Sequence, residues 1–394
     1  MHITHITTYY NAKLRYQEHH LIQNQIANGH NVTIITSQWN PPFPNYEEVY
    51  KPILGDQFIG LGLFIEHKLN VIRLPFHSSP SILSHLEHLT ILLKTIKPNL
   101  IICHGFEGGL ICVQCALSRI PTIIDSHYVK LHDDMYPQKI RYKKLIGNMI
   151  NKFKPIILKR FDVKYVGVTE DSVKFLLKSG AEPSDVRMIP LAVDEQFFAF
   201  NKSDRKEIRA RLGLADKDFL IVTTGKIEEY KGIHLVIEAI ATLRKEDINL
   251  LIVGNVGKEY GLTLRKISDN ANLNNNIFYH GYADHAELVK LFCACDIAVY
   301  PKSISISHIE AMSVGLPIIV SEQDAVRHRI EYGNGFTVAE DNVVDLASKI
   351  ETLYFNRDLR KEMGRNSRKL VEEKLGAAIM NRRFMELFPV SSIF

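Results

Sequence analysis

Short apolar runs alternate with stretches of helical periodicity along most of this chain, and no other feature limits its fold as strongly. Such runs, when they span about four to eight residues, are typical of strands buried on both faces. Strands of this kind that alternate with helices predict an α/β fold, in which helices cover a parallel sheet. In the first half we expect strands at 2–7, 31–36, 100–103 and 122–125, and helices at 16–28 and 81–96.

The second half repeats the alternation, after a run at 188–194 that leads out of the first domain. A chain of 394 residues is long enough for about two domains of roughly 100 to 200 residues each. In folds of this class, ligands bind at the carboxyl ends of the strands. In the second domain we expect strands near Leu250, Ile277, Ile297, Ile318 and Phe336.

The composition, 46% hydrophobic and 23% charged, is that of an ordinary globular protein. The net charge of +4 is too small to require a polyanionic partner, and no basic motif with interleaved aromatic residues indicates nucleic acid binding. No apolar run reaches the length of about 18 residues that a membrane-spanning helix needs. The amino terminus lacks the pattern of a signal peptide, so we expect a cytoplasmic protein.

The five cysteines are odd in number and lie in apolar surroundings, so we expect reduced thiols in the core. Cys112 and Cys115 have the two-residue gap of a zinc half-site or of a redox pair. A zinc site needs a second such pair, which the sequence lacks, and a redox pair normally opens a helix rather than lying inside an apolar run. We therefore expect no metal site.

The segment at 307–322 has the pattern of a short helix followed by a buried strand. Apolar residues recur at helical spacing up to Gly315, and 316–320 is a continuous apolar run. Glu310 lies in the first turn of this helix, after the polar loop at 302–307. A carboxylate there can accept the paired hydroxyls of a ribose, or it can be a simple charge at the helix terminus. The segment alone leaves both interpretations open.

A second motif follows the expected strand at 219–224, where the turn at 225–232 carries Lys226 and Lys231. Fixed cations at such a turn can stabilise the negative charge that a nucleoside diphosphate gains as it leaves a sugar. Two lysines near a turn are more often solvated surface, so this motif gains weight only beside the segment at 307–322. No dinucleotide-binding glycine pattern follows the strand, and the chain has no Walker-type phosphate loop.

Together these segments resemble the signature of the retaining glycosyltransferases of family 4, which have the GT-B fold. The stretch from Glu310 to Pro317 is similar to the family's second glutamate followed by Ala-Met, a small residue, Gly and Leu-Pro. Lys226 and Lys231 match the family's spacing of two cations before a glycine. The resemblance covers most of the chain and implies two Rossmann-like parallel-sheet domains that face each other across a cleft.

The resemblance also implies the extent of each domain. It places an acceptor-side domain at 1–195 and a nucleotide-sugar-binding domain at 204–375, while a helix within about 376–394 crosses back onto the first domain. In this family the two cations hold the donor diphosphate and the second glutamate contacts the ribose. No metal or other cofactor is implied, because cationic side chains and helix dipoles neutralise the diphosphate. The residues that inherit donor roles are Lys226, Lys231, Glu310, Gly225, Ser303 and Ser305.

Two departures from the family pattern stand out. Lys302 lies eight positions before Glu310, where the family has its first glutamate, so the role of contacting the donor sugar has no obvious heir. In the first loop, the family often places paired glycines close to the diphosphate, whereas this chain has Leu14 and Arg15. Arg15 either supplies charge to the donor in their place or is merely exposed.

The first domain offers further candidates. His127 follows an expected strand at the position where the family often has a histidine that faces the donor sugar. A histidine after a strand is more often structural, but a place at the expected cleft favours function. His104 and Glu107 follow the strand at 100–103 and are candidates for contact with the acceptor, although an ordinary polar loop explains them equally well.

The segment at 139–160 contains eight lysines and arginines and no acidic residue, with apolar residues at helical spacing. A basic amphipathic helix suits an anionic membrane surface, where each basic residue is worth roughly 1 kcal/mol. The alternative is a helix packed on the core with a solvated basic face. If the first interpretation holds, the protein is peripheral on the inner face of the cell membrane.

We therefore expect a retaining, metal-independent glycosyltransferase that uses a nucleotide sugar of UDP or GDP type. Its acceptor would be a hydroxyl of a glycan or of a lipid-linked glycan, in the synthesis of bacterial surface polysaccharide or glycolipid. Two alternatives remain. One is an inactive accessory relative, which the missing first glutamate favours, and the other is a nucleotide-sugar epimerase of the same architecture.

Overall fold

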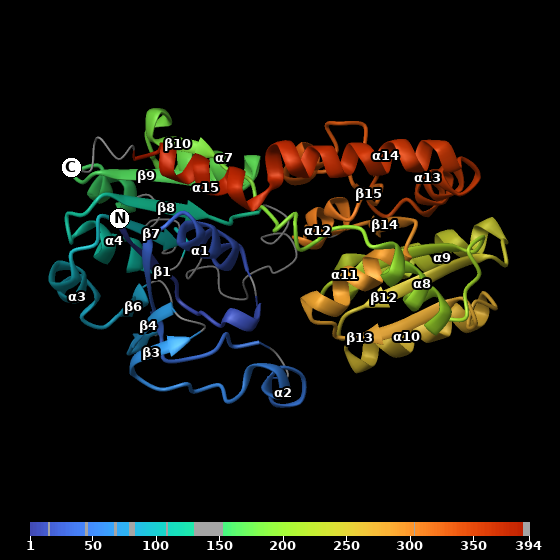
Figure 1. Cartoon of the computed structure of the whole chain (residues 1–394), viewed down its shortest axis with the longest axis horizontal. Helices are drawn as coiled ribbons and strands as arrows, with labels where there is room; N and C mark the ends of the chain where they lie inside the picture. Colours follow the sequence, from blue (N-terminus) through green and yellow to red (C-terminus); the bar gives the residue numbers. More distant parts are fainter. Residues whose placement is uncertain are drawn as a thin grey trace. The chain divides into compact units, whose positions relative to one another are not determined.

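The computed structural model describes residues 1–14, 16–43, 46–66, 69–78, 83–107, 109–129, 153–302 and 304–388 (Figure 1). The chain divides into two compact units. The N-terminal unit comprises Met1–Leu191 and Ala377–Phe394, and the C-terminal unit comprises Ala192–Gly376. Each unit is built on a mainly parallel sheet with helices packed against it, so the α/β fold expected from the sequence is confirmed.

The sheet of the N-terminal unit has eight strands in the order β10-β9-β8-β7-β1-β2-β4-β3. All neighbours are parallel except β3, which runs antiparallel to β4 at the edge. β1 lies between β2 and β7, so the strand order reverses there, and such a reversal opens a crevice at the carboxyl ends of the strands. The strands are β1 (His2–Ile6), β2 (Asn31–Ser37), β3 (Gly62–Glu66), β4 (Leu69–Leu74), β7 (Leu100–His104), β8 (Thr122–Ser126), β9 (Val163–Gly167) and β10 (Val186–Met188).

Helices pack on this sheet, and α15 near the end of the chain packs against α1. Apolar residues of β1, β2, β7, β8 and β9 form the core together with α3 and α4. The helices are α1 (Gln17–Ala27), α2 (Lys51–Leu54), α3 (Leu89–Ile96), α4 (Ile111–Ala116), α7 (Glu170–Ser179) and α15 (Ala377–Glu386).

The helix expected at 81–96 begins only at Leu89, so its first part was wrongly placed. Two short strands, β5 (Phe76–His77) and β6 (His85–Leu86), pair instead, and β6 lies within the range expected for the helix. His88 then adopts a left-handed backbone with φ of 57°, a conformation that a right-handed helix cannot continue through. The hairpin and this residue together set the start of α3.

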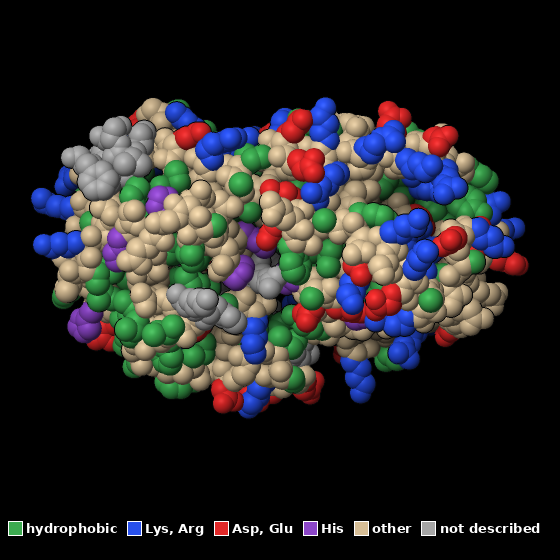
Figure 2. All heavy atoms as spheres, in the orientation of Figure 1, with side chains coloured by type: hydrophobic (Ala, Val, Ile, Leu, Met, Phe, Trp, Pro, Cys, Tyr) green, Lys and Arg blue, Asp and Glu red, His purple; other side chains and the backbone are tan. Residues whose placement is uncertain are grey.

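The edge strand β3 exposes an apolar stripe. Leu61 precedes the strand and is 54% exposed, while Leu63 and Ile65 within it are 66% and 78% exposed. Phe64 points the other way and packs on the core. Figure 2 shows hydrophobic side chains gathered on the N-terminal unit over the region of β3 and β4.

The C-terminal unit has a six-stranded parallel sheet in the order β13-β12-β11-β14-β15-β16. Its strands are nearly continuous apolar runs, as expected for a sheet covered on both faces. The order reverses between β11 and β14, so the favoured ligand position is at the carboxyl ends of these two strands. The strands are β11 (Phe219–Thr224), β12 (Ile248–Val253), β13 (Ile277–Gly281), β14 (Ile297–Tyr300), β15 (Ile318–Ser321) and β16 (Gly335–Val338).

Seven α-helices are described in this unit, and α9 and α13 pack together on the core. Short 3-10 turns at Glu229–Lys231 and Asp324–Arg329 follow β11 and β15. The helices are α8 (Lys202–Arg211), α9 (Ile233–Leu243), α10 (Lys258–Asn270), α11 (His285–Ala294), α12 (Ser307–Ser313), α13 (Val343–Phe355) and α14 (Arg357–Leu370).

The five cysteines are buried free thiols. Cys112 and Cys115 lie within α4, and burial raises the pKa of the Cys112 thiol to about 12, which keeps it protonated and unreactive. Within the described ranges, no three or more His, Cys, Asp or Glu side chains gather as metal ligands would. None of the helices described is long and apolar enough to cross a membrane.

Candidate functional site

Gly225, Lys231 and Ser305 come together at the carboxyl ends of β11 and β14. Gly225 follows β11 with φ of +117°, a backbone conformation that favours glycine. A Cβ built on Gly225 would lie 3.4 Å from Lys231 Nζ and 4.0 Å from Ser305 Oγ. Gly254 closes the other side of this turn, since a Cβ there would lie 1.8 Å from the carbonyl oxygen of Gly225. The backbone therefore leaves room beside the ammonium of Lys231.

The two lysines of the turn interact with each other. Burial lowers the pKa of Lys231, the Glu228 carboxylate opposes this effect, and the charge of Lys226 lowers the pKa further. Lys226 itself forms an ion pair with Glu228. Two ammonium groups held close together attract a polyvalent anion, because the anion relieves their mutual repulsion.

Glu310 is buried in α12, with a side chain only 3% exposed. Burial raises the pKa of its carboxyl to about 7, although a hydrogen bond from Ser307 partly offsets the effect. His285 lies within reach of this carboxyl, with its Nε2 3.6 Å from Glu310 Oε1. The oxygens of an ionised carboxyl at this position can accept hydrogen bonds from a ligand.

Tyr300 joins the two segments that carry these side chains. Its hydroxyl lies 3.0 Å from Thr224 Oγ1 at the end of β11 and donates to the backbone carbonyl of Ser307, 3.1 Å away, at the start of α12. The ring packs on His308 with centroids 4.3 Å apart. The sequence patterns did not single out this tyrosine, which fixes the position of α12 relative to β11.

Lys302, at the position of the family's first glutamate, is engaged by a carboxylate. Its Nζ lies 2.8 Å from each carboxylate oxygen of Asp341. Its aliphatic stem packs over Gly232, where a built Cβ would lie 3.1 Å from Cγ and Cδ of the lysine. The charge of Lys302 is thus balanced within a local ion pair.

The candidates in the N-terminal unit gather around Asp125, the penultimate residue of β8. His104 Nδ1 donates to Asp125 Oδ2 across 2.6 Å, and the backbone N–H of Gly105 donates to Oδ1 across 2.8 Å. His127 Nε2 lies 3.5 Å from the same Oδ2, and its ring is 42% exposed. Asp125 was not among the residues predicted from the sequence, although a single acid at the end of an apolar strand is a signal.

The charges of this cluster follow from burial and from the carboxylate. Burial alone lowers the pKa of both imidazoles, but Asp125 outweighs it, so the pKa of His104 is raised and that of His127 reaches about 9. Burial opposes ionisation of Asp125, yet the two imidazolium groups hold its pKa well below the usual range. His127 therefore presents a positive edge to solvent at neutral pH.

A buried relay continues from this cluster into the unit. His104 Nε2 lies 2.9 Å from His5 Nδ1, and His5 Nε2 lies 2.8 Å from the side-chain oxygen of Gln25. Because that oxygen only accepts, His5 donates from Nε2 and accepts at Nδ1, so His104 donates from both ring nitrogens. Burial lowers the pKa of His5 to about 3, which agrees with a neutral His5 beside a cationic His104.

Two carboxylates flank the histidines. Glu107 is exposed and accepts a hydrogen bond from the hydroxyl of Ser126, next to Asp125. Glu18 lies in the first turn of α1. Burial raises the pKa of its carboxyl, and the charges of His104 and His127 partly offset that rise. His104, Glu107 and His127 thus lie at one edge of the sheet. Arg15 and Ser303, two donor candidates from the sequence, lie outside the described residues, as does the part of the basic segment at 139–152.

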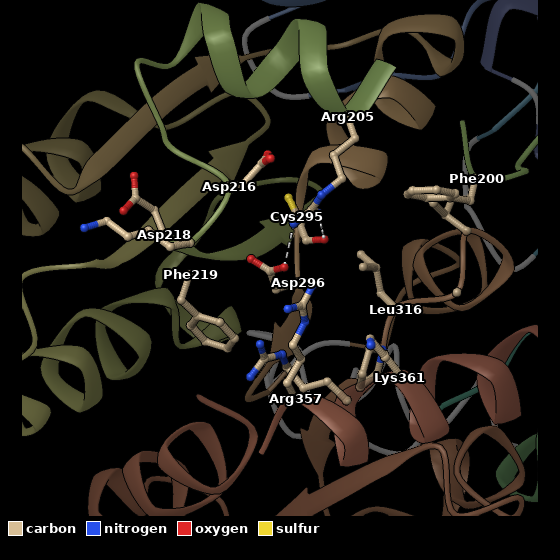
Figure 3. Close-up of a pocket in the computed structure, with 15 residues that line it drawn as sticks. Phe200, Arg205, Asp216, Asp218, Phe219, Cys295, Asp296, Leu316, Arg357 and Lys361 are labelled. Atoms are coloured by element: carbon tan, nitrogen blue, oxygen red, sulfur yellow. Dashed lines mark hydrogen bonds and ion pairs between the residues drawn. The ribbon is translucent and has the colours of Figure 1, made fainter. Parts of the chain in front are cut away.

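A cavity of about 530 Å³ in the C-terminal unit lies elsewhere (Figure 3). It is lined by Phe219 at the start of β11, Asp296 just before β14, and Pro317 just before β15. These are the amino ends of the strands, and Gly225 and Ser305 lie at the opposite ends. The cavity is therefore separate from the site that the lysines and Glu310 indicate.

Two family models together match most of the chain. The model of the family described as "Glycosyltransferase Family 4" matches residues 19–197, and the model described as "Glycosyl transferases group 1" matches residues 204–370. The chain belongs to the family 4 glycosyltransferases. The resemblance that the sequence motifs indicated is thereby confirmed.

Among curated relatives of this family 4 chain, the D-inositol 3-phosphate glycosyltransferase of Paenarthrobacter aurescens is 26% identical over 194 residues, which are 47% of each chain. An uncharacterised glycosyltransferase of Methanocaldococcus jannaschii is 25% identical over 276 residues, which are 67% of this chain and 66% of the relative. The match to the D-inositol 3-phosphate glycosyltransferases spans about half the length of those proteins.

Solved structures of similar fold cover nearly all of the chain. HepE of Anabaena, crystallised in complex with UDP, has a TM-score of 0.74 at 18% identity, covering 98% of this chain and 99% of its own. A glycosyltransferase of Rickettsia africae has a TM-score of 0.74 at 16% identity, covering 99% of each chain. At such identities the agreement concerns the fold, and it confirms the GT-B class.

Proposed function

We propose that the protein transfers a sugar from a nucleoside diphosphate sugar to a hydroxyl group of an acceptor, with retention at the anomeric carbon. The observation that carries this proposal is the grouping of Lys231 Nζ, the open face of Gly225 and Ser305 Oγ at the carboxyl ends of β11 and β14. Family membership supports it, as does the UDP bound to HepE in the solved structure of that protein.

In this proposal each candidate site residue of the C-terminal unit has one role in binding the donor. Lys226 and Lys231 neutralise the charge that grows on the diphosphate as the glycosidic bond breaks, so they lower the barrier late in the reaction. The backbone at Gly225 and the Ser305 hydroxyl hold phosphate oxygens. Glu310 accepts the ribose hydroxyls. These cationic and polar groups supply the charge that the leaving group requires, so no metal ion is assigned a step.

The N-terminal unit supplies the remaining groups. From the family resemblance we assign His127 to the donor sugar, and His104 and Glu107 to the acceptor side. The leaving phosphate takes the proton of the acceptor hydroxyl, so no protein side chain acts as base. The acceptor is a glycan or a lipid-linked glycan, as in the synthesis of surface polysaccharide or glycolipid.

The end of the basic segment supports a peripheral place on a membrane. In the helical residues at 153–158, Phe153, Ile156 and Ile157 are 56%, 60% and 43% exposed, beside the basic Lys159 and Arg160. Lys154 does not share this exposed face, because it is buried and donates to the Phe106 carbonyl. Sedimentation with phosphatidylcholine vesicles, with and without phosphatidylglycerol, tests the assignment, and an Ile156→Glu variant should lose the binding to anionic vesicles.

One observation favours a second candidate, an accessory protein that binds nucleotide without transfer. Lys302 and Asp341 form an ion pair where relatives of the family place the first glutamate. A nucleotide-sugar epimerase is a third possibility for this architecture. Incubation with a nucleotide sugar and no acceptor separates it, since an epimerase alone would change the sugar.

The first test is calorimetric titration with UDP, GDP, ADP and CDP. We expect one of them to bind, with UDP or GDP preferred, and Lys231→Ala to weaken it at least tenfold. The exposed lysine of α10, replaced in Lys266→Ala, is a matched control that should bind like the wild type. Absence of binding by all four nucleotides would contradict the proposed function. Product analysis by NMR then decides the anomeric outcome.

A further inference from the structure

Arg329 is a buried cation without a carboxylate partner among the described residues. It ends the 3-10 turn after β15, and its side chain is fully closed to water. Nη1 donates to the backbone carbonyl of Ser305 across 2.5 Å, while Nε and Nη2 have no acceptor in the described part of the chain. Burial lowers the pKa of Arg329 to about 10, so the guanidinium stays charged at neutral pH.

The other two large, fully buried arginines are compensated. Arg73 pairs with Glu66 across 2.7 Å and also donates to backbone carbonyls. Arg209 lies 3.5 Å from Asp296 and donates to the carbonyls of Ala294 and Ala215. A buried charge is costly unless it is paired, so the state of Arg329 requires an explanation outside the stability of the fold.

The place of Arg329 in the sheet gives that explanation. β11, β14 and β15 are adjacent and parallel, so the segments that follow them meet at one edge. Gly225 follows β11, Ser305 follows β14 and Arg329 follows β15. Ser305 links the other two, because its carbonyl accepts from Arg329 and its hydroxyl lies beside the space at Gly225 and Lys231.

We propose that Arg329 is a positioning residue of the nucleotide site. It is a third cation, which holds the loop at 304–306 (the Ser305 loop) beside Lys231. Its charge is balanced when a diphosphate binds. The inference rests on the proposed function and deepens it. Arg329 acts through the Ser305 loop and through its charge, while Lys226 and Lys231 touch the phosphates.

This role makes the effect of Arg329 specific to phosphate. UDP carries the diphosphate and uridine does not, so loss of the arginine should weaken UDP far more than uridine. Loss of Glu310, which faces the ribose in the proposed site, should weaken both. If Arg329 had only a structural role, its loss would weaken the affinities for UDP and uridine by the same factor.

The experiment compares Arg329→Met, Arg329→Lys and Arg209→Met in the full chain. Arg329→Met should bind UDP about tenfold more weakly, bind uridine within twofold of the wild type, and unfold at the same temperature or higher, because it removes an unpaired buried charge. Arg329→Lys keeps the charge and a nitrogen that can donate to the Ser305 carbonyl, so it should retain most of the UDP affinity. Arg209→Met should lower the unfolding temperature without changing UDP affinity.

Hydrogen exchange of the amides at 304–307 provides a readout that needs no ligand. Arg329→Met should speed exchange there, and Arg209→Met should not. Unchanged exchange in Arg329→Met overturns the proposal, as does equal weakening of UDP and uridine, or unchanged UDP affinity in a protein that binds UDP. A wild type that binds no nucleotide contradicts the proposed function and removes the phosphate role, while exchange still decides whether Arg329 fixes the loop.

Discussion

The carboxylate of Asp125 and the imidazole of His104 meet across 2.6 Å with almost no access to water, at 0% and 6% exposure. Inside a protein, a carboxylate without a cation would be strongly disfavoured, so this pair exists as an ion pair. The pair also lies within 3.5 Å of His127, which reaches solvent. The charge of the exposed ring is therefore set by a buried acid.

Replacing Asp125 by Asn should return the pKa of His127 from about 9 toward its ordinary value of 6.5. NMR titration of the imidazole nitrogens measures this directly. An unchanged midpoint in the variant would contradict the assignment, and His85, remote in the sequence and exposed in part, serves as an internal reference.

The same substitution should change how stability depends on pH. The pKa of His127 is raised on folding, so its contribution is complete below about pH 6.5 and is lost as the pH rises toward 9. The pKa of Asp125 is lowered on folding, so its contribution is present above about pH 4 and is lost in acid. The wild type should therefore exceed Asp125→Asn in stability most clearly between these limits, as urea unfolding across pH will test.

Glu310→Gln should gain stability and lose nucleotide affinity. The pKa of Glu310 is raised from 4.5 to about 7, so ionisation costs folding free energy that grows between these pH values and is complete above 7. The variant should then be more stable than the wild type by about 3 kcal/mol above pH 7 and equal to it below pH 4.5. Calorimetry should show weaker UDP binding, because an amide cannot accept two ribose hydroxyls as a carboxylate does.

Gly254→Ala should disturb the nucleotide site from behind. Gly254 has φ of +141°, and an added Cβ would overlap the carbonyl of Gly225 at 1.8 Å. We expect a loss of at least about 2 kcal/mol in unfolding free energy and a clear fall in UDP affinity. Gly257→Ala is the matched control, since Gly257 has φ of −60° and nothing within 4 Å of its added Cβ. It should lose only about 1 kcal/mol, because alanine is a poorer N-cap for α10 than glycine, and it should bind UDP like the wild type.

Asp341→Asn should have little effect on stability. Asp341 is 62% exposed, and ion pairs with so much solvent contact are worth about 1 kcal/mol or less. Lys302→Ala should cost more, because it also removes the stem that packs over Gly232. Urea unfolding of the two variants gives the comparison, and equal losses would mean that the stem contributes nothing.

The parts of the site that could be predicted are those written in contiguous residues. The strand at 219–224 and its lysine turn show themselves by a change from apolar to polar residues and by fixed spacing, and Glu310 lies in one short helix. The family resemblance gave these residues roles, and the same apolar runs located the strands of both sheets.

Other residues of the site depend on contacts between distant segments. Arg329 meets Ser305 across 24 positions and Lys302 meets Asp341 across 39, and no local pattern encodes such pairs. The sequence does indicate that His5 is unusual, since a histidine inside a buried parallel strand needs a polar partner. The identity of its partners, Gln25 and His104, could not be predicted, because they lie on α1 and β7 and meet His5 only in the folded unit.

The apolar stripe of β3 has a consequence for work with the purified protein. A sheet edge with open backbone groups and with Leu63 and Ile65 in solvent can pair with the same strand of another molecule. We expect concentrated preparations to lose material through this route before either unit unfolds. A single lysine at position 63 should slow that loss and lengthen the useful life of a sample.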